Sequence, residues 1–218
     1  MNKIIKYIIL TLILTIFQPC IKADKYWEQK VSLFDELTVG PDDIIFLGNS
    51  ITDGGNFDEL FKRSDVKNRG IKSDDIQGVN RRLKQILAGH PKKIFLLIGI
   101  NDISYGLTVE QLANRYKKLV ISIMQQSPQT RLYLQSVMPI NNDFAIYKKL
   151  INKENTIVEF NKKIKHIAET LKLDYIDLWP TLADSDGKLM KQFTNDGLHL
   201  MGAGYKAWIS AIKPYLDE

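Results

Sequence analysis

Short apolar runs alternate with longer stretches of helical periodicity along most of this 218-residue sequence, and the alternation narrows the choice of fold sharply. An apolar run of roughly four to eight residues that is bounded by turn-forming residues predicts a buried strand. Runs of this kind occur at Asp43–Gly48, Ile94–Ile98 and Leu132–Val137, and a shorter one at Leu173–Ile176. A further, weaker strand is predicted at Val66–Asn68. Strands without polar alternation are typical of a parallel sheet that is covered on both faces.

Stretches with helical spacing precede, separate and follow these runs. The clearest covers 108–126, where one stripe of the predicted helix carries Leu112, Tyr116, Leu119 and Ile123. Further helices are predicted at 26–37, around 76–86, around 157–167 and around 205–212. A strand–helix unit repeated about five times predicts the α/β class, with about five parallel strands and helices on both faces of the sheet. In such folds the functional side chains lie at the carboxyl ends of the strands.

The first residues have the pattern of an export signal. Lys3 and Lys6 precede the apolar run Tyr7–Phe17, and Ala23 offers a small residue for cleavage. The uncharged stretch is shorter than the ~20 residues that span a bilayer. We therefore expect a signal peptide at 1–23, a single domain at 24–218, and an exported protein that is periplasmic or secreted, without stable insertion in a membrane after cleavage.

Two other fates of this leader remain open. The leader could stay attached as an uncleaved membrane anchor, or Cys20 could carry a lipid, although Phe17 to Pro19 match poorly the small residues expected before a lipidated cysteine. Cys20 is the single cysteine of the sequence. Cleavage after Ala23 would therefore leave a protein without disulfides and without a thiol nucleophile.

The charge of the chain argues against nucleic acid as a partner. Three of the thirty Lys and Arg residues lie in 1–23, before the first acidic residue, so removing that segment lowers the net charge from +5 to +2. The pairs Arg81–Arg82 and Lys162–Lys163 are explained as solvated helix faces. No sustained basic face remains for nucleic-acid binding.

Ser50 follows the first predicted strand in the run Gly48-Asn49-Ser50-Ile51-Thr52-Asp53-Gly54. A serine that leaves a strand at a tight turn is held firmly beside outward-facing N–H groups, which suits a nucleophile. An N-cap serine is the ordinary structural alternative. The G-x-S-x-G motif and the phosphate-binding G-x-x-x-x-G-K-[ST] loop are both absent from the sequence.

Two further turns follow the second and third strands. Gly70, in Asn68-Arg69-Gly70-Ile71, would let the backbone approach a ligand and present its N–H. Asn101, in Gly99-Ile100-Asn101-Asp102, can donate its side-chain N–H to a developing oxyanion. Taken singly, each is also explained as a turn residue.

The last motif, Asn195-Asp196-Gly197-Leu198-His199-Leu200, precedes the closing helix. A histidine that acts as general base for a serine needs one ring nitrogen facing the hydroxyl and a carboxylate on the other nitrogen. Asp196 and His199 can supply this pair from one turn. Asp-x-x-His alone is also a common coincidence.

The four motifs follow the order Ser, Gly, Asn, Asp-x-x-His, and with them the sequence resembles the SGNH (GDSL-type) hydrolase family from about residue 42 to 215. It looks most like the branch of platelet-activating-factor acetylhydrolase-like and sialate or carbohydrate O-acetylesterase proteins. The resemblance implies a flavodoxin-like three-layer α/β/α sandwich. It implies catalysis by Ser50, Asp196 and His199, with an oxyanion hole of Ser50, Gly70 and Asn101. The family's Gly-Asp-Ser is Gly-Asn-Ser here, so Asn49 keeps the turn hydrogen bonding without the charge.

The function predicted from these residues is a serine esterase that hydrolyses small acyl esters, acetyl above all, on carbohydrates, so the expected partner is a small-molecule or glycan ester. No cofactor is expected, and no metal, because no two histidines have ligand spacing. Phe193 and Tyr105 are candidate substrate-binding residues, while Trp179 is better explained by the core. A lysophospholipase or thioesterase of the same family is one alternative, and a non-catalytic glycan-binding protein is another. The oligomeric state is not indicated.

Overall fold

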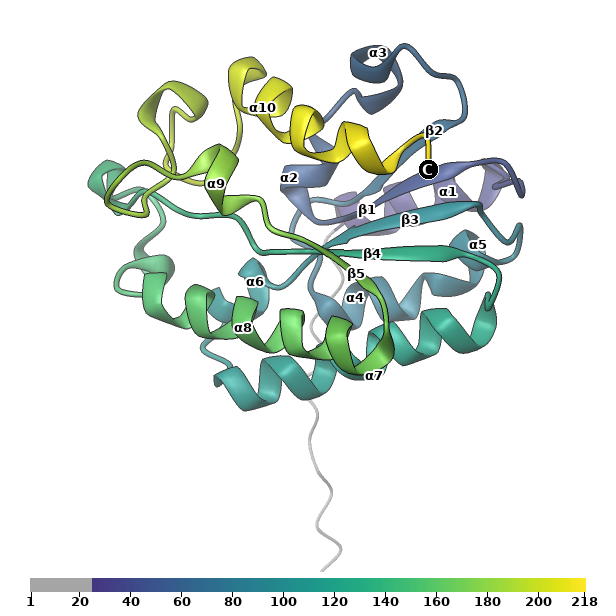
Figure 1. Ribbon diagram of the computed structural model, residues 1–218, viewed down its shortest axis with the longest axis horizontal. Coiled ribbons are helices and arrows are strands. Elements are labelled where there is room, and N and C mark those ends of the chain that lie inside the picture. The colour runs from purple at the N-terminus through teal and green to yellow at the C-terminus, as the bar shows by residue number, and fades with distance from the viewer. Residues whose placement is uncertain (1–24) are drawn as a thin grey trace, which may run out of the picture.

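Five short strands form one fully parallel sheet in the computed structural model, which describes residues 25–218 (Figure 1). The sheet order is β2-β1-β3-β4-β5. The strands are β1 (Ile44–Gly48), β2 (Val66–Gly70), β3 (Lys93–Leu97), β4 (Arg131–Gln135) and β5 (Asp174–Ile176). Strand β1 pairs with β2 from Ile44↔Val66 to Gly48↔Gly70, so these two strands end side by side. The parallel α/β sheet predicted from the sequence is confirmed.

Helices cover both faces of the sheet (Figure 1). One layer holds α4 (Ile76–Arg81), α5 (Leu83–Leu87), α6 (Ile100–Ser104), α7 (Val109–Gln126) and α8 (Glu154–Leu171). The other holds α2 (Ser50–Asp53), α3 (Phe57–Phe61), α9 (Trp179–Leu182) and α10 (Gly202–Ile212). Helix α1 (Lys25–Glu36) lies by the β2 edge, where the Arg69 guanidinium donates to the Leu37 carbonyl just past its end.

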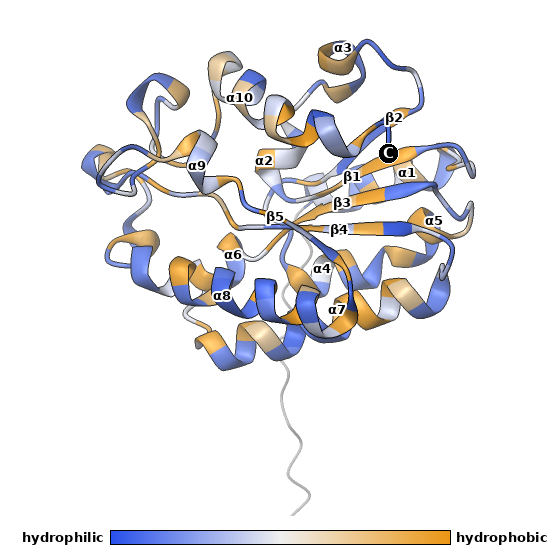
Figure 2. Ribbon diagram, viewed as in Figure 1, coloured by the Kyte–Doolittle hydropathy of each residue, from blue (hydrophilic) through white to orange (hydrophobic). Residues whose placement is uncertain are grey.

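The core forms where apolar helix stripes meet the sheet. Every residue of β1 and β3 is buried, and the helices turn apolar faces inward and polar faces outward (Figure 2). Under α10 the core is aromatic: the rings of Phe46 and Phe57 stack 4.1 Å apart, and Trp208 stands edge-on to Phe57. This burial is the main driving force that fixes the strand ends in place.

The single helix predicted around 76–86 is two helices, α4 and α5, which meet at Arg82. The backbone of Arg82 leaves helical geometry at φ −107° and ψ 11°. Its side chain is fully buried, and its guanidinium donates to Asp74 Oδ2 at 2.7 Å and to the Gly48 carbonyl at 3.1 Å. The break is therefore associated with a buried charged group that ties these helices to the end of β1.

A long connection joins β4 to α8, and we call residues 139–153 of it the strap. It contains two short 3-10 helices, Asn142–Phe144 and Lys148–Leu150, and it returns to the carboxyl ends of the strands. Asn141 anchors the strap to the motif before α10, because its backbone N–H donates to the Gly197 carbonyl at 2.8 Å. The side-chain amide of Asn141 also donates to the Leu189 carbonyl at 2.8 Å.

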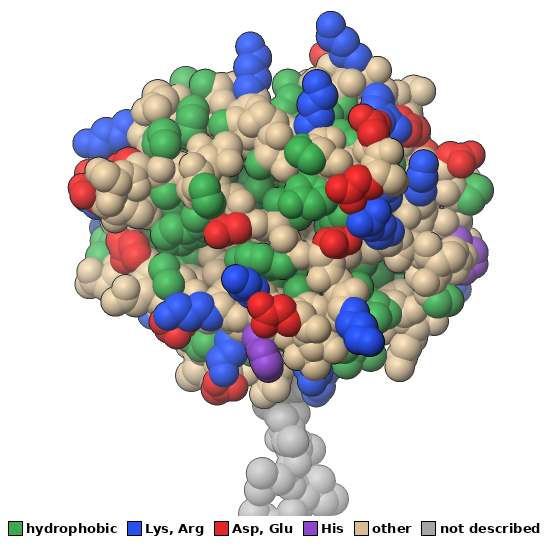
Figure 3. Space-filling model, viewed as in Figure 1, with side chains coloured by type: hydrophobic (Ala, Val, Ile, Leu, Met, Phe, Trp, Pro, Cys, Tyr) green, Lys and Arg blue, Asp and Glu red, His purple; other side chains and the backbone are tan. Residues whose placement is uncertain are grey.

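Within residues 25–218, no helix combines the length and apolar character that a membrane span requires. The predicted signal peptide, its cleavage after Ala23 and the lipidation alternative at Cys20 lie outside the described residues. On the face shown in Figure 3, acidic and basic side chains are interspersed rather than gathered by sign.

Candidate active site

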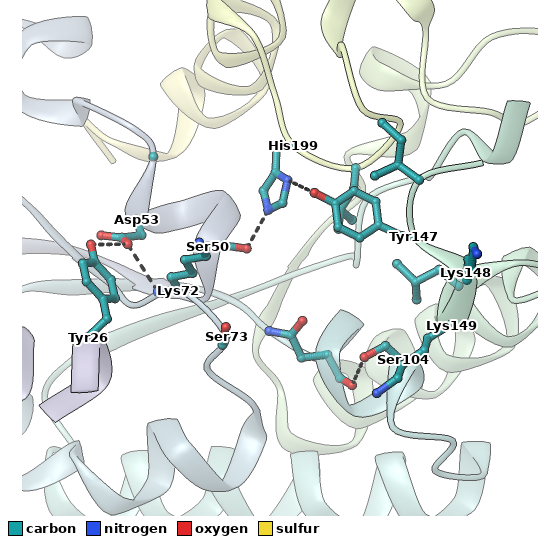
Figure 4. A pocket seen from close by; sticks show the side chains of 15 residues that line it. Tyr26, Ser50, Asp53, Lys72, Ser73, Ser104, Tyr147, Lys148, Lys149 and His199 are labelled. Carbon is teal, nitrogen blue, oxygen red and sulfur yellow. Dashed lines mark hydrogen bonds between the residues drawn. The ribbon is translucent and has the colours of Figure 1, made fainter. Parts of the chain in front are cut away.

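A cavity of about 990 Å³ opens where β1, β2 and β3 end (Figure 4). The turns after these strands, the strap, α1 and the motif before α10 all contribute to its wall. The lining includes Tyr26, Ser50, Asp53, Gly54, Lys72, Ser73, Asn101, Ser104, Ile146, Tyr147, Lys148, Lys149, Leu150, Leu198 and His199. The cavity therefore lies at the carboxyl edge of the sheet, where parallel α/β folds place their sites.

Ser50 is the first residue of α2, directly after β1. Asn49 caps this short helix, because its Oδ1 accepts the N–H of Ile51 at 3.0 Å. The turn hydrogen bonding is thus retained without the family's usual aspartate. The cap and the buried strand hold the Ser50 hydroxyl at the cavity wall.

His199 and Asp196 meet Ser50 from the turn before α10. The Ser50 Oγ lies 2.9 Å from His199 Nε2, and His199 Nδ1 lies 2.7 Å from Asp196 Oδ2. Asp196 Oδ1 also accepts the backbone N–H groups of Leu198 and His199. The structure therefore brings together the three residues that the motifs predicted, although 149 positions separate Ser50 from His199.

Tyr147 of the strap joins this group, and the sequence motifs did not point to it. Its hydroxyl donates to Asp196 Oδ2 at 2.8 Å and lies 3.0 Å from His199 Nδ1. The tyrosine and imidazole rings are tilted by 67° with centroids 5.6 Å apart. Tyr147 follows a Pro-containing break by several residues, and no spacing or motif in the sequence links it to the site.

Hydrogen bonding keeps Asp196 charged in this partly buried position. Burial raises the pKa of the carboxyl, but hydrogen bonds from the His199 ring, the His199 and Leu198 backbone and Tyr147 outweigh burial and lower the pKa to about 2. Burial, followed by the hydrogen bond to Asp196, raises the pKa of the Tyr147 hydroxyl to about 12. At neutral pH the pair is therefore an ionised carboxylate and a neutral phenol that donates to it.

Asn101 lies in the cavity wall at the start of α6. One N–H of its side-chain amide donates to the Asp74 carbonyl at 2.7 Å, which fixes the amide and leaves its second N–H for a ligand. Gly99, two residues earlier, has a φ of 130°, a conformation that favours glycine. The turn therefore places Asn101 as the sequence predicted.

The structure does not support the predicted role of Gly70 as an oxyanion-hole donor. Its N–H donates to Asn68 Oδ1 at 2.7 Å, and Gly70 does not line the cavity. A Cβ at this position would come within 2.2 Å of the Asp53 N, so the glycine permits close packing of the β2 end against α2. Gly70 is accordingly revised from an oxyanion donor to a packing residue.

Ser73, three residues later, lines the cavity that Gly70 does not reach (Figure 4). Its backbone has a φ of 64°, in the left-handed region. Within the described part of the chain its N–H has no hydrogen-bond partner. The loop after β2 therefore does supply a residue of the cavity wall whose N–H is without a partner among the described residues, and that residue is Ser73.

The two candidate substrate-binding residues lie elsewhere. Phe193 is half-buried against the core, and its carbonyl accepts the N–H of Met201. Tyr105 is 48% exposed at the end of α6. Neither lines the cavity. Trp179 is also partly buried against the core, and its indole N–H donates to the Val137 carbonyl.

The arrangement provides an oriented hydroxyl, a base and N–H donors in one cavity. When His199 carries its proton on Nδ1 and donates it to Asp196, Nε2 is left free to accept the Ser50 proton. Nucleophilic catalysis by serine requires this tautomer. Among the described residues, no group of three His, Cys, Asp or Glu side chains is placed to hold a metal ion. The chemistry available to these side chains is acyl transfer.

Comparison with known proteins agrees with this geometry. Residues 46–207 match the model of the GDSL-like Lipase/Acylhydrolase family, and the chain belongs to that family. The protein is a carboxylic ester hydrolase.

Individual relatives are distant in sequence. The chain is 25% identical over 174 residues to platelet-activating factor acetylhydrolase IB subunit alpha1 of Bos taurus, covering 75% of this chain and 70% of the relative. It is 26% identical over 185 residues to the N-acylneuraminate cytidylyltransferase of Escherichia coli, covering 81% of this chain but only 40% of that protein's length.

Solved structures share the fold. A Streptococcus pneumonia structure described under the name platelet activating factor is 31% identical, with a TM-score of 0.81 over 88% of this chain and 93% of the other. An acetylxylan esterase mutant from Geobacillus stearothermophilus has a TM-score of 0.64 at 17% identity, over 82% of this chain and 95% of the other, and this likeness concerns the fold alone.

Proposed function

We propose that this protein hydrolyses small acyl esters, acetyl above all, on carbohydrate carriers, with Ser50 as nucleophile, His199 as general base and Asp196 as its orienting carboxylate. The observation that carries the proposal is the continuous chain of contacts from Ser50 Oγ through His199 to Asp196 Oδ2, at 2.9 and 2.7 Å, with Ser50 and His199 in the wall of the cavity. Hydrogen-bond reach between nucleophile, base and orienting group is the geometric requirement for this mechanism.

In the first half of the reaction, His199 Nε2 accepts the Ser50 proton while Oγ attacks the ester carbonyl. The tetrahedral intermediate collapses, the bond from the carbonyl carbon to the alkoxy oxygen breaks, and the proton passes from Nε2 to the departing alcohol. In the second half, His199 deprotonates a water that attacks the acyl-enzyme, and the carboxylic acid leaves as Ser50 Oγ recovers its proton.

The developing negative charge needs donors on the opposite side of the carbonyl. We assign these donors to the backbone N–H groups of Ser50 and Ser73 and to the second N–H of the Asn101 side chain. The Ser73 assignment rests on its place in the cavity wall and on an N–H without a partner among the described residues, since the Gly70 N–H is already bonded to Asn68. Loss of one such donor typically lowers kcat by about 10²–10³-fold.

The lining of the cavity favours a hydroxylated carrier over a long acyl chain. Most of the lining residues carry a polar or charged group, and the aliphatic ones are Ile146, Leu150 and Leu198. Hydroxyl groups of a sugar can exchange hydrogen bonds with such a wall, whereas a long acyl chain would lack apolar cover. An acetylxylan esterase among the structures of similar fold is compatible with this assignment.

A lysophospholipase or thioesterase activity is the second candidate. It is favoured by Ile146, which lines the cavity yet is 55% exposed, next to Leu150 and Leu198. These side chains could receive a short length of acyl chain. Platelet-activating factor acetylhydrolase among the relatives points in the same direction.

Hydrolysis of p-nitrophenyl acetate, butyrate and octanoate separates the two candidates. We expect acetate to be preferred, and Ser50→Ala to lose at least ~10⁴-fold in kcat. Ser185→Ala, at an exposed loop position, is the matched control and should keep full activity. Preference for octanoate would move the substrate to lipids, and retention of activity in Ser50→Ala would contradict the mechanism itself.

We also propose that residues 1–23 direct export and are removed. The support is the sequence pattern of two lysines, an apolar run and a small residue at Ala23. When the full chain is produced in a bacterium, the mass of the protein recovered outside the cytoplasm should correspond to residues 24–218. Recovery of the unprocessed chain from the membrane fraction would favour the anchored alternative.

A further inference from the structure

Three lysines line the cavity without an acidic partner among the described residues. They are Lys72, from the loop after β2, and Lys148 and Lys149, from the strap. All three are exposed, and none of their ammonium groups forms an ion pair or hydrogen bond within residues 25–218. Their charges are therefore free to meet a ligand.

The acidic side chains nearby are already engaged. Asp53, which lines the cavity, is 3.0 Å from the Lys30 ammonium, and its Oδ2 accepts the Tyr26 hydroxyl at 2.8 Å. Asp143, on the strap, pairs with Lys188 and Lys191. Asp196 is bonded to His199. The cavity consequently carries an excess of positive charge.

The lysines stand on either side of the reacting hydroxyl. In Figure 4, Lys72 lies on the Asp53 side of Ser50, while Lys148 and Lys149 lie on the opposite side with Tyr147. A carrier bound in the cavity would therefore have an ammonium group within its reach on both flanks of its ester.

We propose that the natural substrate is an acyl ester whose alcohol part is anionic, carrying a carboxylate or a phosphate that Lys72, Lys148 and Lys149 recognise. This inference rests on the proposed function, because it names the substrate class of the same site. Opposite charge in a partly enclosed cavity raises both the association rate and the selectivity for the charged ester.

The test compares three phenyl acetates whose para substituent is either neutral or anionic, and each variant is judged by how it changes the ratio between them. Methyl 4-acetoxybenzoate is neutral, 4-acetoxybenzoate carries a carboxylate, and 4-acetoxyphenyl phosphate carries a phosphate. We expect the ratio of kcat/KM for an anionic ester over the neutral one to fall about tenfold in a Lys72→Gln, Lys148→Gln, Lys149→Gln triple variant. Sodium chloride should lower the same ratio in the wild-type protein, because salt screens exposed charges. The two anionic esters show which anion the lysines favour.

The matched control is Lys117→Gln, Lys118→Gln, Lys206→Gln, which removes three exposed lysines outside the cavity lining. It should leave the ratio as it is in the wild-type protein. An unchanged ratio in the cavity variant, or an equal fall in both triple variants, would overturn the proposal. Failure of the wild-type protein to hydrolyse the neutral ester in a Ser50-dependent way would instead overturn the proposed function.

A binding measurement tests the same recognition without turnover. In calorimetry, the Ser50→Ala variant should bind 4-hydroxybenzoate or 4-hydroxyphenyl phosphate with a lower Kd than methyl 4-hydroxybenzoate. Adding the three cavity substitutions should remove the difference. Equal binding of neutral and anionic compounds by Ser50→Ala would count against an anionic substrate.

Discussion

Ser73 holds a left-handed backbone conformation that serine adopts at a cost, and it does so in the wall of the active cavity. We predict that Ser73→Gly raises the free energy of unfolding by roughly 0.5–1 kcal/mol, because relief of the backbone cost exceeds the added entropy of the unfolded chain. The backbone N–H stays in place, so kcat/KM for p-nitrophenyl acetate should change less than about twofold. Urea unfolding and steady-state kinetics measure both effects.

A loss of activity of about 10²-fold in Ser73→Gly would show that the serine hydroxyl, rather than the N–H, serves the reaction. Ser104→Gly is a useful comparison, since Ser104 also lines the cavity but lies in a helix. There the same substitution should lower stability by up to about 1 kcal/mol.

Tyr147 is a positioning residue, because it acts on the substrate through Asp196 and His199. Tyr147→Phe removes the hydroxyl that donates to Asp196 Oδ2 and keeps the ring. We expect kcat to fall about 3–10-fold with little change in KM, since one hydrogen bond to a charged group is lost while the cavity wall remains. Tyr147→Ala should lower kcat further and also raise KM, because the ring itself is lost. Equal kinetics of Tyr147→Phe and the wild-type protein would remove Tyr147 from the mechanism.

Among single residues, the sequence predicted those whose chemistry is tied to a local pattern. Ser50, Asn101, Asp196 and His199 each stand in a short motif at a strand end or before the last helix. The structure places Ser50, Asn101 and His199 in the wall of one cavity, with Asp196 bonded to His199. Tyr147 could not be predicted, because only the return of the strap brings it to the site. Gly70 was predicted for the oxyanion hole because glycine readily adopts backbone conformations that other residues avoid. Here Ser73 adopts such a conformation, the left-handed one.

Between helices and strands, buried polar side chains set geometry that hydrophobic periodicity does not reveal. The stripe of Ile76, Val79, Leu83 and Ile86 predicts one continuous helix, but α4 ends where Arg82 turns inward to Asp74 and the Gly48 carbonyl. Asp74 also accepts the indole N–H of Trp27 and, through its carbonyl, the amide of Asn101. One buried pair thus ties α1, α4, β1 and α6 around the cavity.

Asp102 makes the contact between α6 and α4 sensitive to pH. The carboxyl is fully buried, its Oδ2 accepts the N–H of Ile76 at 3.0 Å, and burial followed by the charge of Asp75 raises its pKa from 3.8 to about 7. The folded state therefore binds more protons than the unfolded state between about pH 4 and 7. The contribution of Asp102 to the free energy of unfolding is therefore present below about pH 4 and is lost as the pH rises toward 7.

We predict that Asp102→Asn removes this part of the pH dependence. In the wild-type protein Asp102 should lower the free energy of unfolding by up to about 1.4 kcal/mol per pH unit as the pH rises from about 5 to 7. In the variant the decline should be visibly smaller over the same range. Asp35→Asn, at an exposed position of α1, is the control and should follow the wild-type slope. Parallel curves for Asp102→Asn and the wild-type protein would mean that the carboxyl titrates near its ordinary pKa.

Across the whole chain, the order of strands and helices was predictable because the central strands β1 and β3 are nearly continuous apolar runs and the long helices α7 and α8 each carry one apolar stripe. The edge strand β2, with the sequence VKNRG, gave the weakest signal. Parallel pairing then leaves few topologies, since every crossover must pass a helix over the sheet. The short helices α2, α3, α6 and α9 were not predicted, because four or five residues are too few to show periodicity. The path of the strap depends on long-range contacts such as Asn141 to Gly197, which no local pattern encodes.

The elements of this molecule differ in how firmly they are held, and α1 is the weakest of the longer helices. Phe34 is its one buried residue, and Arg69 and Arg81 place their guanidinium groups over the rings of Phe34 and Trp27. Its polar attachments include those of Lys30 and Tyr26 to Asp53 and of Trp27 to Asp74. A partly buried ion pair and single hydrogen bonds contribute less against local opening than an apolar core does, and β1 and β3 are buried along their whole length.

Hydrogen exchange followed by mass spectrometry should therefore show early exchange in α1. Its amides should exchange through local opening at free energies several kcal/mol below those of β1 and β3, which exchange only through global unfolding. Because α1 supplies Tyr26 to the cavity wall, a bound anionic product such as 4-hydroxybenzoate should slow exchange in α1 more than in β3. Protection of α1 equal to that of β3 in the free protein would mean that the polar contacts of Tyr26, Trp27 and Lys30 hold the helix as firmly as the core holds the sheet.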